Sequence, residues 1–95
     1  MERVAREVAR RLGIGLAEIS SQGRGRAASQ ARALTAWAGR EAGNVSTAST
    51  AKHFGRDTST MARNVARLET GMRGEKGMRK LGSELLKSLS VFGIP

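Results

Sequence analysis

The amino-acid sequence predicts an all-α fold, a small helical bundle of about five helices that contains a helix-turn-helix. Apolar residues recur every three or four positions in several segments, and no segment alternates apolar and polar residues as a strand would. Glycines and small hydroxyl residues stand where helices need to end or begin. The chain has 95 residues, which suits one domain spanning 1–95. Its core must rest on small side chains, because there is one Trp, two Phe and no Tyr.

The first half of the chain predicts two helices with a turn and a loop between them. Residues 2–12 carry a valine or leucine at every fourth position, and Gly13 is a typical helix end. Residues 14–19 predict a turn into a short helical piece. A second, longer helix is expected over 28–42, and its apolar face is formed by Ala31, Leu34, Trp37 and Ala38.

The centre of the chain predicts the helix-turn-helix, over about 46–72. A short helix over 48–53 is expected to end at Gly55, and a longer helix begins within a few residues. Each helix has two candidate N-caps, which are Ser46 or Thr47 for the short helix and Asp57 or Thr58 for the longer one. The apolar stripe of the longer helix consists of Met61, Val65, Leu68 and Met72.

The end of the chain predicts a linker followed by a packing helix. Residues 71–77 are rich in glycine and charge, which favours a linker. A last helix over 78–89 is expected to pack back on the bundle through Met78, Leu81, Leu85 and Leu89.

The charge balance indicates a polyanionic partner. Lys and Arg number 17 against 8 acids, giving a net charge of +9, and 13 of the basic residues are Arg. Between Ser20 and Leu68 there are eight basic residues and only Glu41 and Asp57 as acids, so this segment carries +6. Arginine suits phosphate and guanine contacts.

Composition argues against an enzyme and predicts no cofactor. There is no Cys, so a thiolate metal site is excluded, and the lone His53 is expected on the surface rather than as a general base or metal ligand. The chain lacks a Walker-type phosphate loop, an apolar membrane span and a secretory leader. A cytoplasmic, nucleoid-associated protein with no membrane or small-molecule partner is the expectation.

The start of the longer helix offers the candidate base-reading residues. Thr58, Ser59 and Thr60 bring hydroxyls to a helix N-terminus, where N–H groups also attract phosphate. Asp57 fits two roles, accepting from cytosine in the major groove or capping the helix and orienting Arg56. In the loop Gly23-Arg24-Gly25-Arg26, flexible arginines suit insertion into a narrow minor groove.

Two blocks of sequence resemble the C-terminal DNA-binding domain of the bacterial replication initiator DnaA. They are Ala31-Arg32-Ala33-Leu34-Thr35-Ala36-Trp37-Ala38-Gly39-Arg40-Glu41 and Phe54-Gly55-Arg56-Asp57-Thr58-Ser59-Thr60. Similar domains occur in some REP-associated transposase-like proteins. Thr58 stands where the family has histidine, one glycine of the turn is missing and Thr50 replaces an apolar residue. These departures argue against recognition of the initiator's own DNA box.

The resemblance implies roles for individual residues. Arg24 matches the arginine of a basic loop that enters the minor groove, and Thr47 matches the start of the short DNA-contacting helix. Arg32 and Arg40 match basic residues on the long helix, with Arg40 placed for phosphate. The base-reading positions are matched by Asp57, Thr58 and Ser59, followed by Thr60.

Together these observations predict a monomer that binds double-stranded DNA. In this prediction the longer helix enters the major groove, and Arg24 and Arg26 enter the adjacent minor groove. The phosphates are held by Arg32, Arg40 and Arg63. One alternative is a helical protein-interaction module with a generically basic surface, which would expose the leucines of 78–89. RNA is a second alternative, against which the scarcity of aromatic stacking residues argues.

Overall fold

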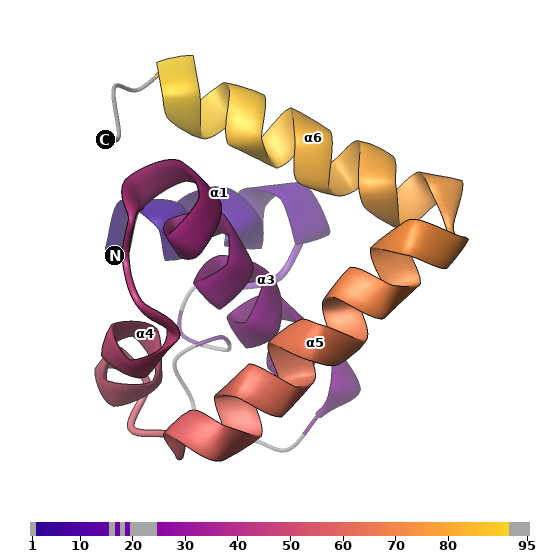
Figure 1. The fold of residues 1–95 in the computed structure, drawn as a ribbon. Coiled ribbons are helices and arrows are strands. Elements are labelled where there is room, and N and C mark those ends of the chain that lie inside the picture. The colour runs from indigo at the N-terminus through magenta and orange to yellow at the C-terminus, as the bar shows by residue number, and fades with distance from the viewer. Residues whose placement is uncertain (1, 16, 18, 20–24, 92–95) are drawn as a thin grey trace.

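The computed structural model describes residues 2–15, 17, 19 and 25–91, and within these residues the protein is helical without strands. The predicted all-α fold is therefore confirmed. The helices are α1 (Glu2–Leu12), α3 (Arg26–Gly43), α4 (Thr47–His53), α5 (Thr58–Gly74) and α6 (Lys76–Val91). In Figure 1, α6 runs along one edge of the molecule, and α4 with the beginning of α5 lies at the opposite edge.

Helix α3 is the centre of the bundle and packs against α1, α4, α5 and α6. Every residue from Ala31 to Gly39 is buried, so this helix has no solvated face along that stretch. Its alanines allow the neighbouring helices to approach closely, while Leu34 and Trp37 fill the larger spaces. The prediction that Trp37 belongs to the core is confirmed.

The turn between α4 and α5 is fixed by a glycine and two caps. Gly55 has φ +63°, a left-handed conformation that glycine adopts without strain, and the Arg56 amide donates to the Ala51 carbonyl at 2.8 Å. Ser46 caps α4 by accepting from the Ser49 amide, and Asp57 caps α5. One of the two predicted candidates is thus the cap in each helix.

Two predicted boundaries are wrong. Residues 71–77 are not a linker, because α5 continues to Gly74 and only Glu75 separates it from α6. The Glu75 amide donates to the Gly71 carbonyl at 2.8 Å, so the corner itself is hydrogen-bonded. A glycine costs an α-helix only about 1 kcal/mol, which burial of Met72 offsets. At the other end, α3 begins at Arg26, so Arg26 is helical rather than part of a loop.

Helix α6 is held on the bundle by both apolar and ionic contacts. Leu85 and Leu89 are fully buried. Arg11 of α1 reaches across to Glu84 Oε2 at 3.1 Å and also donates to Ser88 Oγ. The leucines of α6 therefore do not form the exposed apolar patch that a protein-interaction module would require.

Two further findings bear on what the chain can do. None of the helices in the described ranges is long and apolar enough to cross a membrane. Those ranges also contain no group of three His, Cys, Asp or Glu side chains placed to hold a metal ion.

Candidate nucleic-acid interface

The first turn of α5 presents small polar side chains to solvent. Asp57, Thr58, Ser59 and Thr60 are all exposed. Asp57 Oδ2 accepts from the Thr60 amide at 3.0 Å and from the Thr60 hydroxyl at 3.3 Å. Asp57 therefore acts as the N-cap of α5 in this structure, and it also binds the Thr60 hydroxyl. Thr58 and Ser59 present their hydroxyls at the tip of the helix.

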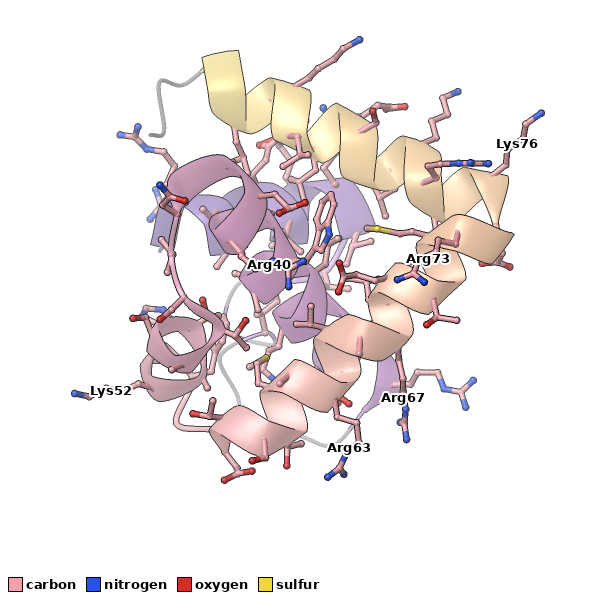
Figure 2. All side chains as sticks on the ribbon, viewed as in Figure 1. Arg40, Lys52, Arg63, Arg67, Arg73 and Lys76 are labelled. Carbon is pink, nitrogen blue, oxygen red and sulfur yellow. The ribbon has the colours of Figure 1, made fainter. Side chains whose placement is uncertain are left out.

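Arginines extend this polar surface along α5. Arg63 and Arg67 are exposed and follow Ser59 at intervals of four residues, which places all three on one helical face. The opposite face consists of the buried Met61, Val65, Leu68 and Met72, as the sequence periodicity predicts. Figure 2 shows the Arg63 and Arg67 side chains pointing away from the bundle below α5. A cationic face therefore continues directly from the hydroxyl-bearing tip.

The beginning of α3 lies beside this face of α5. A groove of about 320 Å³ separates the two helices, and Arg26, Gln30, Asn64 and Arg67 contribute polar groups to its lining. A smaller groove of about 80 Å³ lies nearer the tip of α5 and is lined by Ser29, Arg32, Arg56, Thr60, Met61 and Asn64. The packing of α3 on α5 thus brings cations from distant parts of the sequence to one side. Arg24 lies outside the described residues.

Helix α4 borders the same edge. Thr47, its first residue, is half-buried, and the exposed Lys52 points outward from its last turn (Figure 2). Ser46 and Ser49 hydrogen-bond to each other at 3.0 Å between hydroxyls, which stabilises the start of this short helix. His53 is exposed and its ring meets Phe54 edge-on at 5.0 Å, so the expected surface position of His53 is confirmed.

Arg32 occupies a structural position, contrary to the phosphate-binding role expected for it. The residue is only 4% exposed, and its Nη1 donates to the Ile19 carbonyl at 3.0 Å. Burial lowers the pKa of the Arg32 guanidinium, and the nearby charge of Arg56 lowers it further. A phosphate cannot reach this group without opening the contact to Ile19, so we exclude Arg32 from the interface.

Arg40 joins two helices rather than standing alone. Its Nη2 lies 2.8 Å from Glu69 Oε2 of α5, and its Nε lies 3.7 Å from Glu41 Oε2. These carboxylates compete with any phosphate for the guanidinium. Figure 2 shows Arg40 beside α5 and away from the tip where Arg63 lies. The structure therefore separates Arg40 from the main cationic face.

Sequence reasoning did not select four polar residues that the structure adds to this side, namely Gln30, Lys52, Asn64 and Arg67. The four-residue spacing of Ser59, Arg63 and Arg67 does predict that Arg67 lies on the polar, cationic face of its helix, although Arg67 was not among the predicted DNA contacts. Gln30 and Asn64 gave no signal, since their proximity depends on how α3 packs against α5. Lys52 is the single lysine of a short helix without arginine, and only the fold shows which edge it occupies.

A family model described as the bacterial dnaA protein helix-turn-helix matches residues 1–68. The match runs from α1 to Leu68 of α5 and includes the complete turn with its Asp57 cap. The comparison with curated proteins found no match. The resemblance predicted from the two sequence blocks is thereby confirmed, whereas the similarity to transposase-associated domains stays a prediction. The chain belongs to the bacterial DnaA helix-turn-helix family, a family of DNA-binding domains.

Proposed function

We propose that this chain binds double-stranded DNA in a sequence-specific manner, with the first turn of α5 in the major groove. The observation that carries the proposal is one continuous surface. The exposed residues Asp57, Thr58 and Ser59 lead directly into the exposed Arg63 and Arg67 on the same side of α5. Small hydroxyls at a helix tip suit base edges, and arginines further along suit the phosphates that flank a groove.

The dimensions of α5 support this docking. A helix with its side chains is about 10–12 Å wide, and the major groove is about 12 Å wide. With a rise of about 1.5 Å per residue, Arg63 and Arg67 lie roughly 7 and 13 Å along the axis from Thr58. When the first turn of α5 reaches the base edges, the guanidinium groups of Arg63 and Arg67 are level with the phosphate backbone of the DNA.

Neighbouring elements supply the remaining contacts in the proposal. Arg26, at the first turn of α3, and Lys52, at the last turn of α4, flank α5 and engage phosphates on either side of it. Arg24 enters the adjacent minor groove, as the family resemblance implies. Thr47 and Arg56 contribute to the edge nearest the turn. With about five phosphate contacts, the log–log slope of affinity against salt is near −4 to −5.

Asp57 has two compatible roles in this arrangement. One carboxylate oxygen, Oδ2, accepts the two bonds from Thr60. The other oxygen is positioned by the same cap and accepts from a cytosine amino group in the major groove. Capping thereby orients a base-reading group.

We further propose that residues 1–95 act as a monomeric targeting domain of a replication-initiator-like protein. Membership of the DnaA helix-turn-helix family supports this role. A transposase-associated role uses the same surface and differs in the preferred sequence. Such a domain is nucleoid-associated and needs no cofactor or small-molecule substrate.

The test is selection of bound duplexes from a random pool at ~150 mM salt. An enriched sequence motif supports specific readout, and a pool that stays random refutes it. Thr58→Ala should then weaken the enriched site by ~1–3 kcal/mol while leaving scrambled duplexes unchanged. The rival protein-interaction module predicts weak binding that does not depend on salt.

A further inference from the structure

The outer face of α6 carries a second cluster of positive charge. Lys76, Arg79, Lys80 and Lys87 are exposed, and so are the small residues Gly77 and Ser83 between them. At about 100° per residue, the four cations fall within an arc of about 100°. Leu85 and Leu89, which are fully buried, lie on the opposite side of the helix. We call the four basic residues the α6 cationic face.

No acid of α6 lies within the arc of this face, and Glu84 and Glu75 border it on either side. The sequence of α6 contains a single acid, Glu84. Glu84 Oε2 is 3.1 Å from Arg11 Nη1, so this carboxylate serves the contact between α1 and α6. Solvated surfaces usually intersperse both signs of charge, and a face of one sign attracts polyanions.

The α6 cationic face points away from the helix-turn-helix. In Figure 2, Lys76 extends from the upper right of the molecule, whereas Lys52 extends from the left and Arg63 from the bottom. Helix α3 lies between these edges and packs on both α5 and α6. The molecule measures 29 × 29 × 24 Å, which exceeds the width of a DNA groove. A duplex held by the tip of α5 therefore leaves the α6 face exposed.

The composition of the face identifies its partner. Protein interfaces are enriched in aromatic residues and depleted in lysine, whereas this face offers three lysines and no exposed apolar side chain. Helices that lie on membranes insert Trp, Phe or Leu, which are equally absent from it. Lysines are flexible point charges that suit phosphates without a fixed geometry. Lys76 and Lys87 lie roughly 16 Å apart along the axis, enough to follow several phosphates of a duplex.

We propose that the α6 cationic face binds the phosphate backbone of a second DNA duplex, so that one molecule bridges two duplexes. Binding at this face is independent of base sequence, because only backbone charge is recognised. The inference rests on the proposed function for the first duplex. Each lysine–phosphate contact is worth about fivefold in affinity at ~0.15 M salt, from a slope of about 0.9 per contact.

The experiment separates the two duplexes. A biotinylated duplex of ~20 bp bearing the selected motif is fixed on beads. The protein and a fluorescent scrambled duplex of equal length are then added at salt concentrations from ~50 to ~200 mM. The triple variant Lys76→Gln, Lys80→Gln, Lys87→Gln should bind the labelled duplex roughly 100-fold more weakly at ~0.15 M salt, because three contacts worth about fivefold each are lost. The matched triple variant with arginine at the same positions should capture as much as the wild type. Anisotropy on the first duplex alone should agree within about twofold for all three proteins.

The outcomes are decisive in both directions. Capture that falls with glutamine and survives with arginine supports bridging through α6. Capture that persists in the glutamine variant overturns the inference, and sedimentation of the protein alone then shows whether a dimer joins the duplexes. A wild type that binds the first duplex but captures no second one also overturns it, as expected if α6 instead meets an acidic protein. Failure to bind even the first duplex refutes the proposed function itself.

Discussion

Replacing Arg63 and Arg67 together with glutamine should weaken DNA binding by the same factor on every duplex sequence. Both side chains are exposed on the face of α5 that follows Ser59, and in the proposed docking each meets one phosphate. Loss of two phosphate contacts reduces the log–log salt slope by about 1.8 and the affinity at ~0.15 M salt by roughly 30-fold. Because phosphate contacts carry no base information, the preferred and scrambled duplexes should lose the same amount.

The assay is fluorescence anisotropy on a duplex of ~20 bp, titrated at salt concentrations from 50 to 300 mM. The matched control replaces Arg79 and Lys80 on the outer face of α6, which removes the same charge from the other edge of the molecule. This control should leave the slope and affinity for a single duplex nearly unchanged. Equal losses in the two variants would mean that net charge alone governs binding, and the proposed docking of α5 would be refuted.

Three further predictions concern stability and the cap. A methyl group at Gly82 would lie 2.9 Å from Met72 Cε and 3.0 Å from Trp37 Cη2, whereas one at Gly71 meets nothing within 4 Å. Gly82→Ala should therefore be ~1–3 kcal/mol less stable than Gly71→Ala in urea unfolding, and equal stabilities would contradict this packing. Hydrogen bonding from Arg10 lowers the pKa of Glu7 in the folded protein below 4.5. The ionised Glu7 therefore stabilises the fold above pH 4.5, and this contribution is lost as the pH falls through the lowered pKa of the folded state. Melting temperatures below pH 4.5 should fall less steeply in Glu7→Gln, and an unchanged pH profile would count against this role. Asp57→Ala should cost ~1 kcal/mol, whereas Asp57→Asn keeps the cap and changes the selected motif only if the carboxylate reads a base.

The sequence predicts the helix-turn-helix well because its signals are local. The spacing of Met61, Val65 and Leu68 predicts the buried face of α5, and a carboxylate just before the helix start predicts its N-cap. The corner at Glu75 escapes prediction because glycine is only a weak helix breaker, and whether Gly71 and Gly74 stay helical depends on the packing around them.

Arg32 shows a different limit. Its neighbours from Ala31 to Gly39 are all buried, so α3 lacks the solvated face that an amphipathic pattern leads one to expect. A basic residue in a basic segment then looks like a surface contact in sequence. The fold instead gives its guanidinium the Ile19 carbonyl as a buried acceptor. Burial on all sides is a property of the assembled bundle and has no counterpart in the spacing of α3 alone.

The placement of acids explains why the excess positive charge has a direction. Two carboxylates stand where helices meet: Glu84 binds Arg11 between α6 and α1, and Glu69 binds Arg40 between α5 and α3. Pairing at these contacts neutralises cations in the middle of the molecule. Exposed basic side chains remain on α5 and α6, and also on α1 at Arg3, Arg6 and Arg10. Since field strength near a surface depends on the charges closest to it, each cluster of exposed cations attracts DNA at its own place on the surface. Moving one of these acids to an edge would leave the composition intact and weaken the attraction.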